Sequence, residues 1–388
     1  MAEFDASART FVRGEGNYLV DARGRRLFDA ISSVWTIVHG HCHAQIVEAI
    51  STQARTLDQS TLLGATHPAA EELAERLSAL TGQSRAFFAS DGASAIEAAL
   101  KMALQYWQQR GEPQRTKFVH LIDAYHGDTA AAMSVSDIAV FKSRFGAITF
   151  ETRGLDEPLD ADDVAAVIIE PIIQAAAGMR IVSSERYGPL SESNTLLIVD
   201  EIATGFGRTG TMFAFEQLNL RPDIVCVGKS LSGGALPLSA TLVSEEIYDA
   251  FLGRRGENKQ FFHGHSYAGN PIACAAALAN LKIFERERVL EQVNALSAAL
   301  QRELTALNAL PNVVDARAAG LMCGVEVSDL PFASGPSEMP ALIVADALFE
   351  RGYFTRPIGN VVQFVPPLSS RENELSGFCA SLAEVLSP

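Results

Sequence analysis

The residues with the clearest chemical potential are Asp200 and Lys229, each placed directly after a short apolar run. Residues 196–199 (LLIV) precede the aspartate, and residues 224–228 (IVCVG) precede the lysine. Such runs, bounded by turn residues, are typical of buried strands in a parallel sheet. Because ligands of open α/β sheets bind at the carboxyl ends of strands, we expect both side chains to face one crevice. There Lys229 could hold pyridoxal 5'-phosphate (PLP) as a Schiff base while Asp200 pairs with its pyridine nitrogen. The alternative is a salt bridge at the sheet edge.

Three further predicted strands bring small or polar residues to the same edge. They span residues 85–89, 117–122 and 165–169, and they lead into Gly92, Tyr125 and Glu170, respectively. The turn at residues 90–94 opens a long amphipathic helix that extends to about residue 109. Free backbone N–H groups and the helix dipole favour a phosphate at such a helix start. Tyr125 could cover one face of a planar ring, or it could pack as an ordinary core residue.

The other elements predict a second, smaller domain. Two apolar-rich runs around Gly24 predict a β-hairpin within residues 15–33. Helical patterns occupy residues 46–57, a stretch opening at His67-Pro68, and residues 271–286 and 289–307. Beyond these, strand-like stretches (313–328, 353–365) alternate with helical ones (342–351, 375–386). We therefore predict an α/β fold, with a mainly parallel sheet in a large domain of residues 51–285 and a small α+β domain made of residues 1–50 and 286–388.

The composition indicates a folded protein and excludes several functional classes. Of the 388 residues, 48% are hydrophobic and 20% are charged, which allows a full core and argues against disorder. A net charge of −15 disfavours nucleic acid and anionic membranes as partners. We find neither a signal peptide at the start nor an apolar run long enough for a membrane span. Five widely spaced cysteines favour reduced thiols in the cytoplasm over a disulfide framework.

Two short motifs suggest other chemistry, but their context argues against it. Residues 205–210 match the G-x-G-x-x-G pattern of dinucleotide sites. However, they do not join a strand directly to a helix in an N-terminal βαβ unit, and no acidic residue follows at the end of the next strand. Residues 41–43 (HCH) lack further ligands at metal-site spacing, so we expect no metal. We assign only loop positioning to His126, His263 and His265.

Four longer stretches together carry a resemblance to a known family. They are VIIEPIIQAAAG, LLIVDEIATGFGRTG, PDIVCVGKSLSGG and FFHGHSYAGNP. This combination resembles the class-III (ω-type) aminotransferases of PLP fold type I, the aspartate aminotransferase-like fold, over nearly the whole chain. Within the family, SSVWTIVHGHCH, AYHGDT and TRPIGNVVQFVPP are similar to the branch that makes 7,8-diaminopelargonate in biotin synthesis.

The resemblance implies specific contacts with the cofactor. Lys229 matches the Schiff-base lysine, Asp200 the partner of the pyridine nitrogen, and Glu170 the acidic residue near that aspartate. Gly92 and Ala93 match the turn that holds the phosphate through backbone N–H groups. Tyr125 and Ile202 match the two side chains that cover the two faces of the ring. The family often has serine at position 93, so Ala93 lacks one hydroxyl contact. Ser266 matches a hydroxyl that reaches the phosphate of the partner subunit, which implies a homodimer.

The resemblance also implies a substrate site for an amine donor and a keto acceptor. The residues matched to this site are Trp35, Tyr125, Asp128, Arg208 and Arg356, the last as the ligand of the keto acid's carboxylate. A surface salt bridge for Arg356 and a purely structural role for Arg208 remain open as alternatives.

The implied reaction is transamination of 7-keto-8-aminopelargonate with S-adenosylmethionine or lysine as donor. The alternative is the same chemistry on another ω-amino acid, diamine or biosynthetic ketone. Two expected departures favour that alternative: Val34 stands where the biotin enzymes have a tryptophan, and an N-terminal HPY-type segment is not expected in this chain. A binding protein without activity is disfavoured because Lys229, Asp200 and the phosphate turn are all present.

Overall fold

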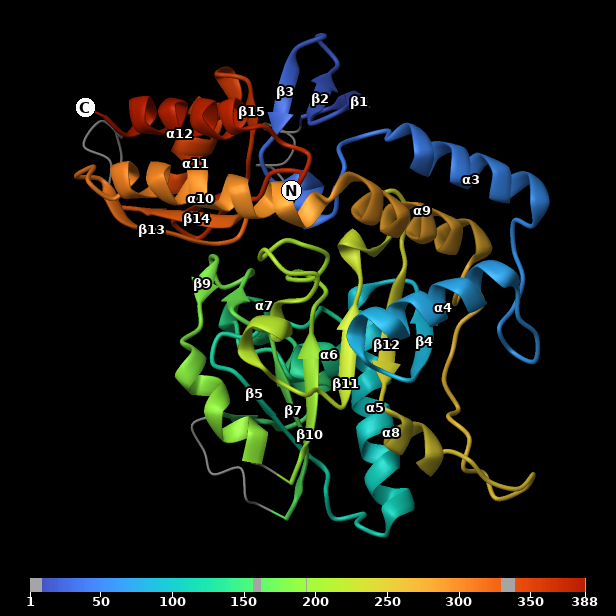
Figure 1. Ribbon diagram of the computed structural model, residues 1–388. Helices are drawn as coiled ribbons and strands as arrows, with labels where there is room; N and C mark the ends of the chain where they lie inside the picture. The colour runs from blue at the N-terminus through green and yellow to red at the C-terminus, as the bar shows by residue number, and fades with distance from the viewer. Residues whose placement is uncertain (1–8, 156–161, 193, 329–338, 388) are drawn as a thin grey trace.

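Seven strands form the central sheet of the larger part of the molecule, in the order β4-β12-β11-β10-β7-β5-β6 (Figure 1). The computed structural model describes residues 9–155, 162–192, 194–328 and 339–387. Neighbouring strands from β6 to β11 run parallel, whereas β12 is antiparallel to both β11 and β4. The predicted α/β fold with a mainly parallel sheet is confirmed. The strands are β4 (Arg85–Ala89), β5 (Lys117–His120), β6 (Arg153–Gly154), β7 (Val164–Ile169), β10 (Leu196–Asp200), β11 (Ile224–Val227) and β12 (Ser239–Val243). The sequence analysis did not predict β6 and β12.

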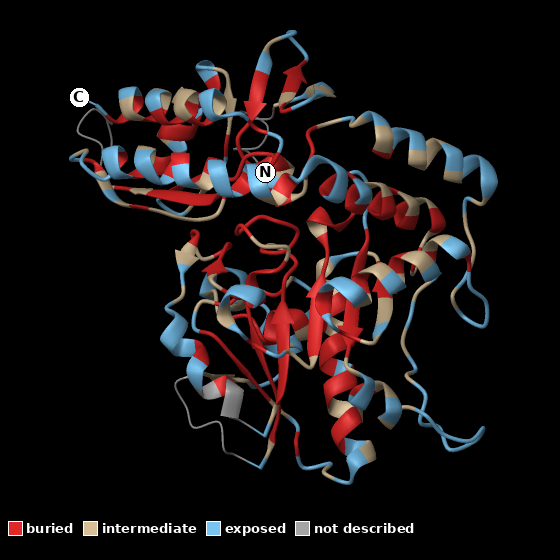
Figure 2. Cartoon of the chain, in the orientation of Figure 1, coloured by how far each residue is buried: buried red, intermediate tan, exposed pale blue. Residues whose placement is uncertain are grey.

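The central strands are apolar because helices cover both faces of the sheet. Every residue of β7, β10 and β11 is buried, as Figure 2 shows for the middle of the sheet. Along β10, Leu197 and Val199 enter the apolar cluster shared with α4 and α9, while Ile198 enters the one shared with α5. Because both faces of these strands are buried, their sequences are largely apolar and do not alternate between apolar and polar residues. The helices of this part are α4 (Pro68–Thr81), α5 (Gly92–Arg110), α6 (Ala130–Ser134), α7 (Ala139–Lys142), α8 (Glu245–Ala250) and α9 (Pro271–Glu287).

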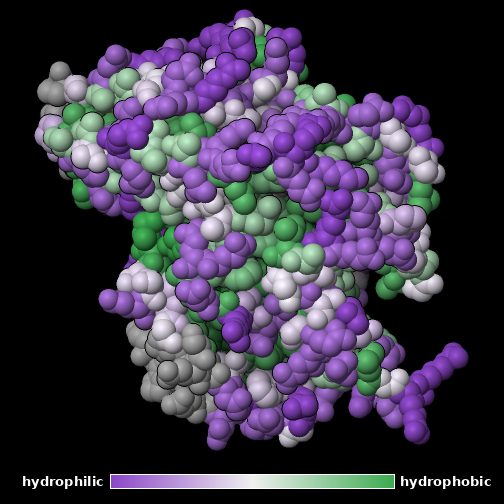
Figure 3. Space-filling model, viewed as in Figure 1, coloured by the Kyte–Doolittle hydropathy of each residue, from purple (hydrophilic) through white to green (hydrophobic). Residues whose placement is uncertain are grey.

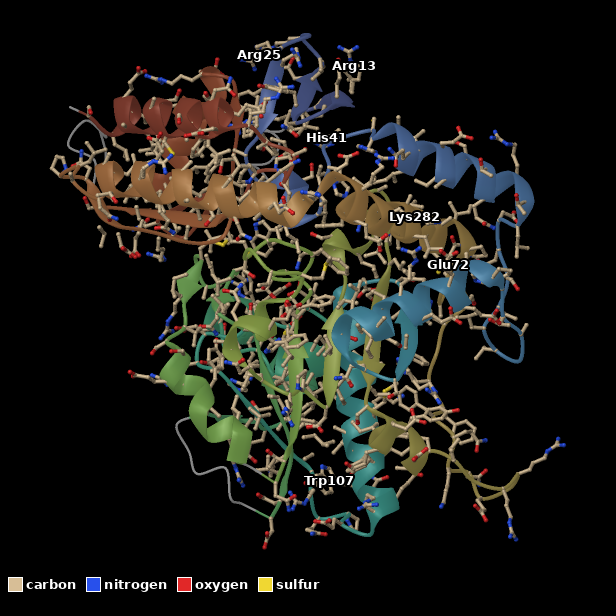
Figure 4. All side chains as sticks on the ribbon, viewed as in Figure 1. Arg13, Arg25, His41, Glu72, Trp107 and Lys282 are labelled. Carbon is tan, nitrogen blue, oxygen red and sulfur yellow. The ribbon has the colours of Figure 1, made fainter. Side chains whose placement is uncertain are left out.

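Capping residues set the start of the predicted helices. The Asp91 carboxylate accepts the Ser94 N–H at 2.9 Å, so α5 begins at Gly92, directly beyond β4. His67 caps α4 by accepting the Ala70 N–H at 3.2 Å through Nδ1. Both starts agree with the sequence analysis. Figure 4 shows Glu72 of α4 beside Lys282 of α9. The Glu72 carboxylate and Nζ of Lys282 lie 3.6 Å apart, and a solvent-exposed ion pair of this kind contributes little to stability.

The smaller part combines both ends of the chain. The predicted hairpin is present as β2 (Tyr18–Asp21) and β3 (Arg26–Asp29), flanked by β1 (Phe11–Glu15) and by β15 (Tyr353–Phe354), which pairs in parallel with β3. A second sheet has the order β13-β14-β17-β16. Its strands and the helices packed on it are β13 (Val313–Ala319), β14 (Met322–Val327), β16 (Pro357–Ile358), β17 (Val361–Phe364), α10 (Val289–Leu307), α11 (Pro340–Glu350) and α12 (Glu372–Leu386).

The proposed domain boundaries both fall inside helices. Residue 50 lies within α3 (Ala44–Thr56), and residue 285 lies within α9, which packs against α3. The short elements α2 (Ser32–Trp35), β8 (Ile173–Gln174), β9 (Arg180–Ile181) and the 3-10 turns η1 (Gly146–Ile148), η2 (Ser184–Glu192), η3 (Ala214–Leu218) and η4 (Lys229–Ser232) complete the described chain. On the face seen in Figure 3, hydrophilic side chains predominate over the outer helices. Among the described helices, none has the length and apolarity needed to cross a membrane.

A buried carboxyl holds the loop that follows β10. Glu201 accepts a hydrogen bond from the Thr204 hydroxyl at 2.6 Å and another from the Phe215 N–H at 2.8 Å. The side chain is fully buried, and burial raises its pKa from 4.5 to about 7, opposed by those hydrogen bonds. The protonated form is therefore favoured by the fold at acidic pH.

We expect Glu201→Gln to flatten the pH dependence of stability. The native state holds the Glu201 proton more tightly than the unfolded chain, so the free energy of unfolding falls as pH rises from about 4.5 to about 7. Glutamine can keep both hydrogen bonds but cannot ionise, which removes on the order of 2 to 3 kcal/mol of that decline. Urea unfolding of the cofactor-free protein at both ends of this window measures the effect. Equal declines in the wild type and the variant would contradict it.

Candidate active site

Asp200 and Lys229 meet at the carboxyl edge of the sheet, as the spacing of the sequence predicts. Asp200 ends β10, and Lys229 lies two positions beyond β11, the parallel neighbour of β10. Both line a cavity of about 440 Å³ that also includes Trp35, Asp91, Gly92, Ala93, Tyr125, His126, Gly127, Asp128, Thr129, Glu170, Ala176, Ile202 and Ala203. The cavity therefore brings together most of the residues that the sequence analysis singled out.

Two hydrogen bonds fix the Asp200 carboxylate. Its Oδ2 lies 2.7 Å from Nδ1 of His126, and its Oδ1 accepts the N–H of Ile202 at 3.0 Å. His126 is itself held by its own N–H, which donates to the Ser136 hydroxyl at 2.9 Å. The sequence analysis assigned His126 only loop positioning. That assignment is corrected, because the imidazole directly contacts the carboxylate, and only the AYHGDT motif could have suggested this.

Lys229 presents a free amine in a strained backbone. Its φ of 39° lies in the left-handed region, directly after Gly228. Nζ makes no hydrogen bond or ion pair with any described residue, and it lies 5.2 Å from the ring centre of Trp35. Burial lowers the pKa of Lys229, while the nearby Asp200 and Glu170 carboxylates oppose the change. A lowered pKa gives more of the neutral amine, which is the nucleophilic form.

Glu170 and Tyr125 are joined behind the cavity. The Glu170 carboxylate accepts the Tyr125 N–H at 3.0 Å, and burial raises the pKa of Glu170 to about 7. The Tyr125 hydroxyl donates to Asp128 at 3.0 Å, and its ring packs edge-on against Phe141 with 5.5 Å between centroids. Burial, followed by the bond to Asp128, raises the pKa of the Tyr125 phenol, so it stays a donor.

The start of α5 forms a cradle for an anion. The first backbone N–H groups of a helix have no partner within the helix, and Gly92 and Ala93, the first two residues of α5, line the cavity. Space for a side chain is absent: a Cβ on Gly92 would lie 3.0 Å from the Ile202 side chain. A Cβ on Gly127, whose φ is 131°, would lie 2.6 Å from Cβ of Ala93. A side chain at either glycine would therefore collide with residues packed around the helix start.

These residues fit the chemistry of PLP. The group needs an anion cradle for its phosphate, an amine for its aldehyde, a carboxylate for its ring nitrogen and apolar cover for its ring. The start of α5, Lys229, Asp200, and Tyr125 with Ile202 provide these, all around one cavity. The unpartnered Nζ of Lys229 is the observation that tests the fit, because a structural lysine at this depth would be paired.

A second cavity of about 500 Å³ adjoins the first and places Arg356 in the same site. Trp35, Tyr125, Asp128, Ala176 and Lys229 line both cavities. Arg356 is exposed and its guanidinium pairs with no described carboxylate, which argues against the surface salt bridge left open above. The other residues that line the second cavity are largely apolar: Ile31, Val34, Ile138, Val140, Phe141, Pro357, Ile358 and Gly359, together with the polar Gln363. A long substrate with a carboxylate end could therefore run from Lys229 to Arg356.

The wall next to Lys229 is a left-handed turn. Four consecutive residues from Ser32 to Trp35 have φ between 48° and 66°. Each such residue costs about 1–2 kcal/mol relative to the right-handed conformation. Asp29 offsets part of this cost by accepting the N–H and the hydroxyl of Ser33 at 3.0 and 2.8 Å. The turn presents Val34 and Trp35 to the second cavity.

Arg208 does not line either cavity, so the prediction that it binds substrate is corrected. Its side chain is fully buried, and its guanidinium donates to the carbonyls of Ile37 and Pro366, both at 2.8 Å. Because burial outweighs the distant Asp29 carboxylate, the pKa of Arg208 falls to about 9. Arg208 therefore holds the loop after β10 against Ile37 and Pro366. This is the purely structural role that the sequence analysis left open as the alternative to substrate binding.

Ser266 lies outside the cavities of its own chain. It is exposed, and its carbonyl accepts the Gln59 side-chain N–H at 2.6 Å. The adjacent His265 approaches Ser90 at 3.4 Å, so this segment runs close to the start of α5 without entering the cavity. Among the described residues, no group of three or more potential ligands could hold a metal ion.

Comparison with known proteins gives matches over the whole chain. The family described as aminotransferase class-III matches residues 3–386. Two relatives named adenosylmethionine-8-amino-7-oxononanoate aminotransferase, from Anoxybacillus flavithermus and Methanocaldococcus jannaschii, are each 39% identical over 100% of this chain and over 93% and 94% of their own.

Solved structures agree with these matches. A crystal structure of the Methanocaldococcus jannaschii enzyme has a TM-score of 0.93 at 40% identity, covering 99% of this chain and 94% of that one. An amine transaminase from an uncultivated Pseudomonas species, in its PLP-bound form, has a TM-score of 0.92 at 31% identity, covering 100% and 96%.

We expect Lys229→Ala to abolish covalent retention of PLP. The wild type incubated with PLP should show a visible absorption band, which the variant should lose almost completely because no other amine borders the cavity among the described residues. Lys142→Ala is the matched control, since Nζ of Lys142 instead donates to the carbonyls of Ser134 and Ser136. Borohydride reduction followed by peptide mapping identifies the labelled lysine. A label on a residue other than Lys229 would refute the assignment.

Proposed function

This chain belongs to the class-III aminotransferases and depends on PLP, and from that premise we propose its substrates and the roles of its residues. The proposed reaction converts 8-amino-7-oxononanoate (7-keto-8-aminopelargonate) to 7,8-diaminopelargonate in biotin synthesis. The proposed amino donor is S-adenosylmethionine or lysine. The observation that carries the proposal is the pair of adjoining cavities, in which Lys229 lines both and Arg356 lines the second together with largely apolar residues.

The residues around the first cavity have the properties that the transfer needs. When bound, PLP supplies the electron sink for the reaction. Asp200, held by His126, would keep a proton at the pyridine nitrogen, because a carboxylate beside a cation favours the charged form. Lys229 would carry the proton to and from the substrate carbon through Nζ. A positioned general acid–base group of this kind contributes roughly 10²- to 10⁴-fold to the rate.

The second cavity supports a substrate with one carboxylate and a long aliphatic chain. A guanidinium can bind a carboxylate through two parallel hydrogen bonds, and Arg356 has no competing described partner. Val34, Val140, Phe141 and Ile358 would shield methylene groups from water. Asp128 offers a negative charge for an amino group, held in place by the Tyr125 hydroxyl at 3.0 Å.

A second candidate is transamination of another amine or ω-amino acid. The observation in its favour is Val34, which is 44% exposed and leaves space where a larger aromatic side chain would narrow the second cavity. The structural likeness to the Pseudomonas amine transaminase is compatible with this candidate. The two candidates share the cofactor chemistry and differ only in the acceptor and donor.

We also propose that the enzyme acts as a homodimer in the cytoplasm. Support comes from large apolar side chains on neighbouring segments, since Leu63, Phe262 and Tyr267 are 71%, 66% and 66% exposed. Asn270 connects the two segments by donating to the Asp58 carbonyl at 3.1 Å and to the Gln59 side chain at 2.8 Å. Ser266 sits between these apolar residues, where it could reach the phosphate of a partner's site. All five cysteines are free thiols, as expected for a reducing compartment.

Substrate assignment is tested by single-turnover reactions. We expect S-adenosylmethionine or lysine to convert the PLP form to the pyridoxamine form, and 8-amino-7-oxononanoate to reverse the change. Arg356→Ala should raise KM for this acceptor about ten- to a hundredfold, because a charge-assisted hydrogen bond contributes roughly 1.5 to 3 kcal/mol. Its KM for a carboxylate-free ketone should not change. A wild type that responds only to simple amines would favour the second candidate.

A mixed dimer tests the role of Ser266. Subunits carrying Lys229→Ala are combined with subunits carrying Ser266→Ala, so that the intact lysine and the intact serine lie on different chains. If Ser266 serves the partner's phosphate, the single competent site should bind PLP as tightly as the wild type. Weak binding equal to that of the Ser266→Ala homodimer would place the serine in its own subunit's site, and a monomer at working concentration would refute the dimer.

A further inference from the structure

Gln363 is a buried polar residue that directly joins two parts of the second cavity. It lies in β17, is only 3% exposed and lines the cavity beside Arg356. Its Oε1 accepts the indole N–H of Trp35 at 2.9 Å, and its Nε2 donates to the backbone carbonyl of Arg356 at 2.7 Å. One amide therefore connects Trp35, next to Lys229, with the backbone of Arg356.

The orientation of this amide is determined by its partners. The indole nitrogen of Trp35 can only donate a hydrogen bond, and the carbonyl of Arg356 can only accept one. Flipping the amide would leave both contacts unsatisfied in a buried place, which costs about 1–3 kcal/mol for each group. Gln363 therefore holds one position, and no side chain that is solely a donor or solely an acceptor can replace it.

The backbone around Gln363 reinforces this link. β16 and β17 form a hairpin in which Pro357 pairs with Val362, so Arg356 lies across from Gln363 at the next step. The Thr355 hydroxyl donates to the Gln363 carbonyl at 2.6 Å and holds the same end of the hairpin. The two residues that make up the turn of the hairpin, Gly359 and Asn360, are exposed. Apart from the strand pairing, the amide of Gln363 is thus the contact that ties the Arg356 backbone to the cavity wall.

The other partner of Gln363 is the strained turn. Trp35 is the last residue of the left-handed segment, and its ring centre lies 5.2 Å from Nζ of Lys229. Its backbone carbonyl also accepts the Ser230 hydroxyl at 3.3 Å, so both the backbone and the indole of Trp35 have a hydrogen-bond partner. Because Gln363 contacts both Trp35, which borders the reacting amine, and the backbone of Arg356, we expect a change at Gln363 to alter the separation of Trp35 and Arg356.

We propose that Gln363 is a positioning residue that sets the distance between the reacting amine and the carboxylate-binding guanidinium. It thereby selects the chain length of carboxylate-bearing substrates without touching the reacting atoms. This inference rests on the proposed function of Arg356 as the carboxylate ligand. The inference gives the Gln363 amide a role in substrate specificity, in addition to the packing role of any buried side chain.

The first test uses binding rather than turnover. Nonanoate has the carboxylate and chain length of the proposed acceptor but no reacting group, and Trp35 is one of only two tryptophans that can report its binding by fluorescence. We expect Gln363→Glu to weaken nonanoate binding about tenfold at neutral pH, because an ionised carboxylate cannot donate to the Arg356 carbonyl. The loss should shrink at acidic pH, where the protonated side chain donates again. Equal affinity in variant and wild type, or a wild type that does not bind nonanoate, would overturn the proposal.

The second test uses chain length. With keto acids of increasing length, Gln363→Met should flatten the dependence of KM on length severalfold, because the side chain no longer holds both the Trp35 indole and the Arg356 carbonyl. Gln83→Met is the matched control, since this buried amide donates to the Pro222 carbonyl at 2.8 Å far from the cavities. If Gln83→Met flattened the dependence of KM on chain length equally, a general loss of stability would explain the effect of Gln363→Met, and the positioning role would be refuted.

These outcomes are separable from those for the proposed function. A wild type that binds nonanoate but does not aminate 8-amino-7-oxononanoate refutes the biotin-pathway substrate and leaves the role of Gln363 standing. A wild type that aminates this acceptor with unchanged length dependence in the Gln363 variants refutes only the positioning role.

Discussion

The structure depends on one buried carboxylate, Asp200, held at the end of a central strand. Its two oxygens are committed to His126 at 2.7 Å and to the Ile202 N–H at 3.0 Å, so it has little freedom to turn away from the cavity. An isolated charge at this depth would be costly, and hydrogen bonds together with a cationic partner make it sustainable. A bound pyridine ring with a protonated nitrogen would give this carboxylate a cationic partner in the cavity.

The parallel sheet makes this arrangement possible. Parallel strands bring their carboxyl ends to one edge, so Asp200, Glu170 and Lys229 meet although they are distant in sequence. The smaller part of the molecule then closes the site with the strained turn that carries Trp35 and with the hairpin that carries Arg356. Arg208 and Gln363 hold these two segments through backbone carbonyls and an indole N–H. In the proposed function, the residues that act on the cofactor lie at the edge of the sheet, and those that select the substrate lie on segments braced by buried polar contacts.

Much of this could be predicted from the sequence. The runs at 85–89, 165–169, 196–199 and 224–228 were visible as apolar stretches, and the residues that follow them marked the cavity. Family motifs then supplied the cofactor, which is confirmed, and roles for individual residues, which remain predictions. The strand β12 was missed because its motif, LSATLVS, is short and contains polar residues, although all five residues of the strand are buried.

Side-chain partners were beyond the reach of pattern reasoning. Nothing in the letters distinguishes Arg356, which faces a cavity, from Arg208, which is buried against carbonyl groups. The contact between His126 and Asp200 joins a loop residue to the last residue of β10 and appears only once the sheet is assembled. The left-handed turn at Ser32 to Trp35 contains no glycine, which is the usual signal for such a backbone. Tertiary contacts, rather than local preference, impose that conformation.

The most direct test of the central claim is the protonation state of the pyridine nitrogen in bound PLP. ¹⁵N NMR of the enzyme loaded with ¹⁵N-labelled cofactor measures it, in the wild type and in Asp200→Asn. We predict a protonated ring nitrogen in the wild type across the neutral range and an unprotonated one in the variant, because asparagine cannot stabilise the charge. An unprotonated nitrogen in the wild type, or the same chemical shift in both proteins, would contradict the account.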